Sequence, residues 1–400
     1  MDPFVFDSYS IDETGHIVSF RYRFGSHSYE ERIILNQGSL HLVPDKDLLD
    51  RILFNLHLAL GISYWKANCS PHIEIKSGHL SDEQATFWNT LYTKGLGEFY
   101  FRNKIDFRSL VHFPSSQGVA ASATPIKKNG KLLVGIGGGK DSVVVWELLK
   151  EQQKEITGLT IKTQHSYQAV EELVAKMQLP TVGVERIIDA TFIKESKNHT
   201  YNGHVPISMI YAWIGILVSY VGGFDAFVVA NEKSADEGNT DSFGMEINHQ
   251  WSKSSEFEGL FRDYLHATIS PDLDYYSPIR HMTELEIVGK CVTYPQYLPY
   301  ITSCNRNFSI TKQLQQKKWC GECPKCAFAF LLFAAYLPKD TVVALFGKNM
   351  LEDVTLDGLF RDLEGRGGLK PFECVGTFEE AREALGMIVA KNEFNLAHHL

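Results

Sequence analysis

The sequence predicts an α/β protein whose parallel sheet carries helices on both faces, preceded by a smaller α+β region and followed by a cysteine-rich region. Three observations predict this architecture. An apolar run at residues 132–136 leads through a glycine-rich loop into a helix-like pattern. Strand-like and helix-like segments then alternate, which favours parallel strands joined by helices. Four of the seven cysteines lie within residues 304–326.

The chain divides into three parts by composition. Its 400 residues are enough for one large or two ordinary domains. Small and polar residues at 114–128 predict a linker. We therefore expect an N-terminal α+β domain at residues 1–115, a central α/β domain at 129–300, and a region at 301–400 that combines a cysteine-rich metal site with C-terminal helices.

The N-terminal part begins with two patterns of alternating apolar and polar residues, at 16–24 and 29–35. Such alternation predicts strands, joined here as a hairpin or meander. From Asp45 onward apolar residues recur at helical spacing, and Asp45 is a suitable N-cap. Residues 81–92 predict a second helix that starts with Ser81.

Beyond the linker, predicted strands and helices alternate. The predicted strands are residues 132–136, 154–161, 181–187 and 225–230, and the predicted helices are residues 143–150, 167–177, 208–220 and, after the cysteines, 327–336. The apolar stretch at 207–221 is too short to cross a bilayer, and it contains Tyr211 and Trp213. We expect it to be a buried core helix, and we expect no membrane insertion.

Charge and cysteine content restrict the partners and the compartment. The net charge of -9 argues against binding nucleic acid through a basic surface, so no nucleic-acid partner is expected. The N-terminus has no basic stretch followed by an apolar run, which argues against a signal peptide. An odd number of cysteines does not fit a secreted disulfide scaffold. A cytoplasmic location follows, whereas nothing in the sequence specifies an oligomeric state.

The glycine-rich loop is a candidate phosphate site. Glycines allow a sharp turn and bring backbone N–H groups close to an anion, and the following helix directs its positive end toward the same place. The spacing fits neither a Walker A loop nor a dinucleotide fingerprint. The alternative is an ordinary turn between a strand and a helix. The candidate binding residues are Gly137, Gly138, Gly139, Lys140, Asp141 and Ser142.

This loop resembles the PP-loop, Ser-Gly-Gly-x-Asp-Ser, of the ATP pyrophosphatase superfamily, with Gly137 in the place of the serine. The resemblance implies the adenine nucleotide alpha hydrolase-like fold of that superfamily. It also implies that ATP is bound with Mg²⁺, that pyrophosphate leaves, and that AMP is transferred to an oxygen of the substrate. By the same resemblance, the pyrophosphate contacts would come from Gly138, Gly139, Asp141 and Ser142, and Asp141 would help to hold the metal.

A second polar block, residues 231–258, begins where a predicted strand ends. Loops at the carboxyl ends of parallel strands are where α/β sheets bind ligands. Glu232, His249 and Lys253 in this block are candidate catalytic residues by residue type. A solvated loop followed by a helix capped at Ser254 is the alternative.

The cysteine block predicts a metal site. Cys320, Cys323 and Cys326 are spaced closely enough to converge on one ion, and Cys304 supplies a fourth thiolate. Four thiolates suit structural Zn²⁺ in tetrahedral geometry. An iron–sulfur cluster uses the same number of ligands, and a redox pair at Cys320 and Cys323 is a further alternative.

Six segments together resemble the UDP-N-acetyl-muramoyl-L-alanyl-L-glutamate epimerase family of bacterial peptidoglycan synthesis. They are GGGKDS, NEKSADEGN, GMEINHQWSKS, SCNRNF, WCGECPKCAFAF and KPFECVGT, and the similarity runs from about residue 130 to the end. The resemblance implies inversion of the terminal L-glutamate of the UDP-muramoyl dipeptide to D-glutamate, with consumption of ATP and release of AMP and pyrophosphate. The N-terminal domain would then be available to hold the UDP-sugar part.

The chemistry explains why an epimerase would use ATP. A proton on the carbon beside an ionised carboxylate is poorly acidic, because the carbanion would form next to a negative charge. An acyl-adenylate removes that charge, so that a base can take the proton and an acid can return one on the other face. Candidates for the acid and base are His249, Glu232, Lys253 and Cys374. The alternatives are a buried, inert Cys374, a structural His249 and a phosphate-neutralising Lys253.

Two other kinds of function compete with the epimerase. The chain could be another PP-loop enzyme, such as a 7-cyano-7-deazaguanine synthase, an amide synthase or a tRNA thiolation enzyme. In that case AMP release would depend on ammonia, an amino donor or a sulfur donor. The chain could also be a nucleotide-binding module without enzymatic turnover, in which Asp141→Ala would abolish no catalysis.

Overall fold

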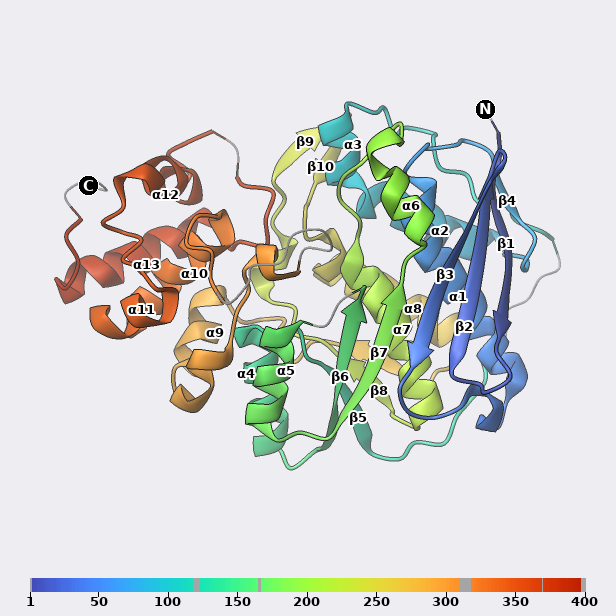
Figure 1. Ribbon diagram of the computed structural model, residues 1–400, viewed down its shortest axis with the longest axis horizontal. Helices are drawn as coiled ribbons and strands as arrows, with labels where there is room; N and C mark the ends of the chain where they lie inside the picture. The colour runs from blue at the N-terminus through green and yellow to red at the C-terminus, as the bar shows by residue number, and fades with distance from the viewer. Residues whose placement is uncertain (1, 118–122, 165–166, 309–317, 369, 397–400) are drawn as a thin grey trace.

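The computed structural model describes residues 2–117, 123–164, 167–308, 318–368 and 370–396 (Figure 1). Its centre is a nine-stranded sheet. In sheet order the strands are β11 (Asp274–Tyr276), β8 (Ala226–Val228), β5 (Lys131–Gly135), β6 (Glu155–Thr163), β7 (Thr181–Ile187), β3 (His27–Leu35), β2 (Ile17–Phe24), β1 (Phe4–Ile11) and β4 (Ile73–Ile75). A separate pair of strands is formed by β9 (Thr240–Ser242) and β10 (Met245–Ile247).

The five strands from β11 to β7 are parallel, as the sequence predicts for the central part. The N-terminal strands do not form a sheet of their own. Instead β3 pairs antiparallel with β7, and β2 and β1 continue outward as an antiparallel meander. The predicted fold class, an α/β protein with a mostly parallel sheet, is therefore confirmed.

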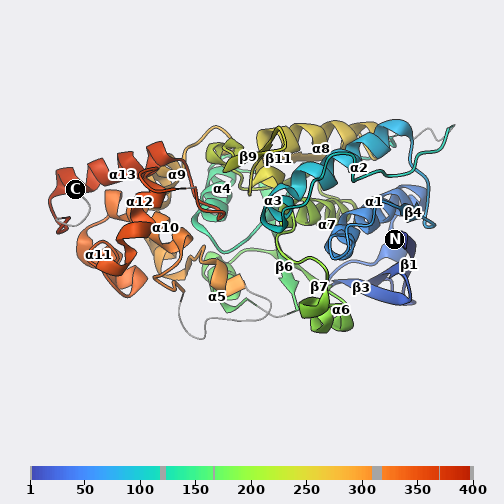
Figure 2. The ribbon, with the colours of Figure 1, turned by 90° about the horizontal axis from the view of Figure 1, so that it is seen from above.

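The helices of the described residues lie on both faces of this sheet and, toward the C-terminus, beside it. They are α1 (Lys46–Trp65), α2 (Asp82–Gly95), α3 (Gly97–Asn103), α4 (Lys140–Glu151), α5 (Gln168–Met177), α6 (Ala190–Lys194), α7 (Ile207–Gly222), α8 (Ser255–Thr268), α9 (Glu284–Cys291), α10 (Pro324–Tyr336), α11 (Lys339–Phe346), α12 (Asp357–Leu363) and α13 (Phe378–Lys391). The strand order reverses between β7 and β8, and since parallel crossovers are right-handed, α7 lies on the face opposite α4 and α5. Figure 2 shows α7, α1, α8 and α2 gathered on one side.

Local sequence signals explain where several helices begin. The side chain of Asp45 accepts a hydrogen bond from the N–H of Leu48 and caps α1. Ser81 caps α2 in a complete capping box, and Ser254 caps α8 through the N–H of Phe257. Each of these side chains satisfies an amide that the first helical turn leaves without a partner. The helix starts predicted at Asp45 and Ser81 are therefore confirmed, and Ser254 caps a helix as in the alternative interpretation of its segment.

The predicted apolar helix forms α7, which is buried in the larger core. Trp213, near the middle of this helix, is fully buried there. In the part of the chain that the structure describes, no helix is long and apolar enough to span a bilayer. Residues 118–122 of the predicted linker lie outside the described residues, and its remaining residues form neither helix nor strand.

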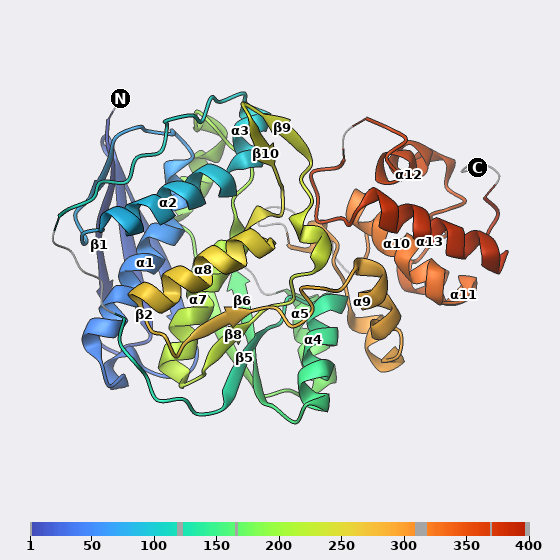
Figure 3. The same cartoon turned by 180° about the vertical axis from the view of Figure 1, so that it is seen from behind.

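A buried ion pair joins the N-terminal strands to the parallel sheet. Arg186 on β7 donates through Nε to Glu31 on β3 at 2.5 Å and through a terminal nitrogen to Ser63 on α1 at 3.0 Å. Both ionic side chains are almost completely buried. The C-terminal helices α9 to α13 pack around α10 in a second core, next to α4 (Figure 3).

Candidate active site

A cavity of about 450 Å³ opens at the carboxyl ends of β5, β6 and β8. The chain runs from β5 to β6 on one side and returns to β8 on the other, so β5 and β8 flank a topological switch point. Ligands of open α/β sheets bind at such points. Apolar side chains form one part of the wall, including Leu159 and Ile161 from β6 and Val229, which follows β8.

The glycine-rich loop forms the floor of this cavity. Gly137, Gly139, Asp141 and Ser142 line it, whereas Gly138 makes the turn with a φ of 86°. A Cβ atom on Gly138 would also lie 3.0 Å from Val170, so a side chain here would be both strained and crowded.

Helix α4 begins at Lys140, with Gly139 as its N-cap. Glycine provides no side chain to cap the helix, so amide groups of the first turn are left for another acceptor. Ser142 donates a hydrogen bond back to the carbonyl oxygen of Gly139 at 2.9 Å and holds the loop in shape. The arrangement suits a phosphate group, since both the amides and the helix dipole favour an anion.

Lys140 lies behind the loop, not in the cavity. Its ammonium group contacts the carboxylates of Asp141 and Glu284, and all three side chains are largely withdrawn from solvent. Burial lowers the pKa of Lys140, but the two carboxylates outweigh burial and raise it, so the lysine is charged. Burial in turn raises the pKa of Asp141, and the positive charges of Lys140 and Lys325 lower it below its ordinary value. Asp141 is therefore an ionised carboxylate on the cavity wall, suited to a cation such as Mg²⁺.

Cys374 and Lys253 reach the same cavity from other parts of the chain. The Lys253 ammonium lies 3.7 Å from the Cys374 sulfur. The imidazole of His249 also interacts with this sulfur, and its Nδ1 lies 2.5 Å from Glu98 on α3. The carboxylate of Glu98 accepts a further hydrogen bond from Arg102. The carboxylate of Glu98, the imidazole of His249 and the thiol of Cys374 therefore form a row of interacting groups, and the thiol lies at the cavity.

The charges around Cys374 favour its thiolate form. Burial alone raises the pKa of a thiol, but Lys253, His249 and Lys325 together lower the Cys374 pKa to about 5. Burial likewise lowers the pKa of His249, and its bonds to Cys374 and Glu98 raise that pKa to about 9. At neutral pH the pair is therefore a thiolate and an imidazolium ion.

The remaining catalytic candidate, Glu232, is buried but does not line the cavity. Its negative charge helps to raise the pKa of Lys253, after burial has lowered it, so that Lys253 stays protonated. The structure also adds residues that sequence reasoning missed: Glu98, Glu284 and Lys325. Lys325 stands between two of the cysteines, lines the cavity, and lies 3.8 Å from Glu284.

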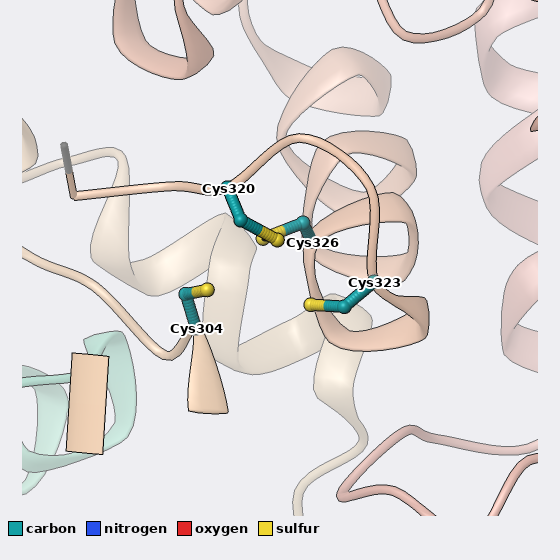
Figure 4. A group of neighbouring side chains, drawn as sticks. All are labelled: Cys304, Cys320, Cys323 and Cys326. Carbon is teal, nitrogen blue, oxygen red and sulfur yellow. The ribbon is translucent and has the colours of Figure 1, made fainter. Parts of the chain in front are cut away.

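The four predicted metal ligands come together beside the cavity. The sulfur atoms of Cys304, Cys320, Cys323 and Cys326 all lie within 4.8 Å of one another, and no disulfide joins them. Figure 4 shows their side chains directed toward one another, Cys304 from a loop and Cys326 from the first turn of α10. Tetrahedral Zn²⁺ with bonds of about 2.3 Å places its sulfurs about 3.8 Å apart. The 3.6 Å between Cys320 and Cys326 fits that geometry.

The cysteine site is connected to the glycine loop through backbone and side chains. The N–H of Thr302, two residues before Cys304, donates to the carbonyl oxygen of Gly138 at 2.9 Å. Ser303 and Asn305 on either side of Cys304 line the cavity. A metal ion in this site would therefore hold one wall of the cavity as well as the start of α10.

The fold and the site together define an α/β protein with a ligand cavity at the switch point of its sheet and a four-cysteine centre beside it. The chain belongs to the MurL family: residues 1–278 match the MurL N-terminal domain, and residues 300–399 match the MurL C-terminal domain.

Three relatives carry the name UDP-N-acetyl-alpha-D-muramoyl-L-alanyl-L-glutamate epimerase. The protein of Xanthomonas oryzae pv. oryzae is 35% identical over 85% of this chain and 74% of its own length. The proteins of a Micromonospora species and of Salinispora tropica are 33% and 32% identical, over 98% and 97% of this chain and 88% and 85% of their own. Among solved structures, a predicted subunit of tRNA methyltransferase from Methanocaldococcus jannaschii matches 40% of this chain and 75% of its own length at 15% identity, with a TM-score of 0.28.

Proposed function

We propose that this protein uses ATP to invert the terminal L-glutamate of UDP-N-acetylmuramoyl-L-alanyl-L-glutamate to D-glutamate, a step of bacterial peptidoglycan synthesis. The names of its relatives support the substrate and the product. One observation carries the mechanism: the glycine loop and a set of acid–base side chains line the same cavity. A nucleotide bound at the loop would therefore deliver its reactive phosphate to the place where a proton can be exchanged.

Adenylation of the α-carboxylate is the first step of the proposed reaction. The carboxylate oxygen attacks the α-phosphorus of ATP, and pyrophosphate leaves. The amides at the start of α4, with Ser142, would hold the departing phosphates. Asp141 would bind Mg²⁺, and the metal would neutralise charge that develops on the phosphates.

Inversion is the second step. The acyl-adenylate makes the α-proton acidic, and groups on the cavity wall remove a proton and return one on the other face. We assign this exchange to His249 and Lys253, each of which contacts the sulfur of Cys374. Glu232 serves in this proposal to keep Lys253 charged. Hydrolysis of the activated acyl group then releases the epimer and makes the sequence irreversible.

Zn²⁺ in the four-cysteine site has a structural role in this proposal. Four thiolates leave no open coordination position, which is the arrangement of structural zinc. The ion would supply rigidity, and the residues that it fixes are the cavity-lining Ser303, Asn305 and Lys325. The N-terminal region, residues 1–115, would contribute to holding the UDP-sugar part of the substrate. Because the reaction consumes ATP and a UDP-linked precursor, we place it in the cytoplasm.

The test is incubation of the protein with UDP-N-acetylmuramoyl-L-alanyl-L-glutamate, ATP and Mg²⁺, followed by chiral analysis of glutamate and separation of adenine nucleotides. The proposal expects D-glutamate together with AMP and pyrophosphate. Unchanged glutamate with no AMP would refute it. AMP that forms only when ammonia or a sulfur donor is added would instead identify another PP-loop enzyme. A matched reaction with Asp141→Asn controls for contaminating ATPases.

A further inference from the structure

Cys374 has the surroundings of a nucleophile. Its side chain is partly open to the cavity that also contains Asp141 and Ser142 of the glycine loop. Behind it, His249 interacts with the sulfur, and Glu98 orients His249 through a 2.5 Å contact with Nδ1. A nucleophile, a base in contact with it and a third group that orients the base form the signature of covalent catalysis.

The charged groups that face the sulfur come from several elements. They are Lys253 before α8, His249 after β10, Lys325 on α10 and the neighbouring Glu373 on the same loop. Three of these four groups are cationic, and Lys253 lies 3.7 Å from the sulfur. Together, these charges favour the thiolate form of Cys374 at neutral pH.

We propose that Cys374 attacks the acyl-adenylate and carries the glutamyl group as a thioester while its α-carbon is inverted. This inference rests on the proposed function, since it needs the acyl-adenylate. The sulfur forms a bond to the acyl carbon, the bond from that carbon to the phosphate oxygen breaks, and AMP leaves with the electron pair. After inversion, water attacks the acyl carbon, and the sulfur leaves as a thiolate. This step gives the D-glutamyl carboxylate, the free thiolate and two protons, so that the whole cycle consumes ATP and water and forms AMP, pyrophosphate, the epimer and protons.

A nucleophilic role suits this thiol better than a basic one. A thiolate whose pKa lies near 5 is a weak base for a carbon-bound proton, because proton transfer becomes less favourable as the base becomes weaker. Nucleophilicity falls more slowly, with a Brønsted coefficient of about 0.4–0.5. An acyl-adenylate is an electrophile with a good leaving group, so even a stabilised thiolate can attack it. A thioester also keeps the α-proton acidic after AMP has left.

Acylation of Cys374 would lower the pKa values of two neighbouring groups, His249 and Lys253. The thiolate is the first of the groups that raise the pKa values of both His249 and Lys253. Conversion of the thiolate to an uncharged thioester removes that stabilisation, while Glu98 still holds His249 in place. His249 and Lys253 can then release protons more readily. Two acid–base groups become available at the stage when the α-carbon must lose one proton and gain another.

The experiment compares wild-type protein with Cys374→Ala in single turnovers, with enzyme in excess over the UDP-muramoyl dipeptide. Acid-quenched wild-type protein should gain the mass of the substrate minus water, on the peptide that contains Cys374, and hydroxylamine should remove it. Cys374→Ala should retain substrate-dependent exchange of pyrophosphate into ATP, since adenylation does not need the thiol. The release of AMP and the formation of the epimer by Cys374→Ala should fall by roughly 10⁶-fold, as for loss of a nucleophile.

Two results separate this inference from the proposed function. If Cys374→Ala releases AMP as fast as the wild type, water attacks the adenylate directly, and the thioester is refuted while adenylation stands. If the wild-type protein shows no substrate-dependent pyrophosphate exchange, the proposed function fails and the thioester fails with it. Cys69→Ala, which alters a buried thiol outside the cavity, is the matched control and should behave as the wild type in every assay.

Discussion

Replacement of Lys253 by methionine should change the pH at which Cys374 ionises. The ammonium group lies 3.7 Å from the sulfur and is the first of the groups that lower its pKa. At an effective dielectric constant of about 20, a charge pair at this distance interacts by about 4 kcal/mol. That energy corresponds to about three pH units. His249 and Lys325 remain in Lys253→Met, so we expect the midpoint to rise from about 5 to between about 7 and 8.

The assay is alkylation of Cys374 by iodoacetamide between pH 4 and 9, followed by mass spectrometry of the peptide that contains it. In the wild type the rate should be almost constant above pH 6, because the thiolate is already formed. An ordinary thiol with a pKa of about 8.5 would gain reactivity about tenfold per pH unit in that range. Lys253→Arg keeps the positive charge and should keep the low midpoint, which makes it the matched control.

The same titration sets the direction of the pH dependence of activity. Because the Cys374 pKa is lowered to about 5, its thiolate is present above that pH and disappears as the pH falls through it. The value of kcat/KM should therefore decline below about pH 5 in the wild type and at a higher pH in Lys253→Met. A wild-type alkylation midpoint above 8, or equal midpoints in the wild type and Lys253→Met, would show that Lys253 does not stabilise the thiolate of Cys374.

Three further predictions concern the loop, the metal site and the sheet. Asp141→Asn should stay folded, because Glu284 still pairs with Lys140, but it should lose pyrophosphate exchange by about 10²–10³-fold, the usual cost of one electrostatic group in a site. The wild type should contain about one zinc per chain by elemental analysis, and Cys326→Ser should lose that zinc and melt at a lower temperature. Wild-type protein that is free of metal and fully active would contradict a structural role for zinc. Glu31→Ala should lose about 3–5 kcal/mol of unfolding free energy in urea, because it leaves the charge of Arg186 buried and unpaired; a loss below 1 kcal/mol would show that this pair is not needed.

Sequence reasoning succeeded where the signal is local. The predicted strand at 181–187 matches β7 residue for residue, and Asp45, Ser81 and Ser254 cap the helices as expected. Helix α4 begins at Lys140, three residues before the predicted start at 143, because the glycine turn leads directly into the first helical turn. The start of a helix beside an unusual loop depends on the conformation of the loop, and the spacing of apolar residues gives no information about that conformation.

Long-range features were outside the reach of sequence patterns. The strands β4 and β11 have three residues each, which is too short for a readable alternation. The pairing of β3 with β7 places Arg32 opposite Ile187, 155 positions later in the chain. No residue type in either strand indicates this pairing. The sequence therefore predicted an N-terminal hairpin or meander, but not its pairing with the parallel sheet.

The same limit applies to the site. The residue types at the glycine loop and in the cysteine block identified those two sets, because their members are close in sequence. Glu98 lies 151 residues from His249, so only the fold brings the two together. Lys325 could have been found from its place between Cys323 and Cys326, since a metal site fixes the direction of the residues between its ligands.

In the proposed reaction, ATP activates the glutamate so that its α-proton can be exchanged within the cavity. The most direct measurement is incorporation of deuterium at the α-carbon when the UDP-muramoyl dipeptide is incubated with the protein in D₂O, with and without ATP and Mg²⁺. We expect deuterium in the glutamate only when ATP is present, together with formation of AMP. Deuterium incorporated without ATP, or inversion accompanied by ADP in place of AMP, would contradict it.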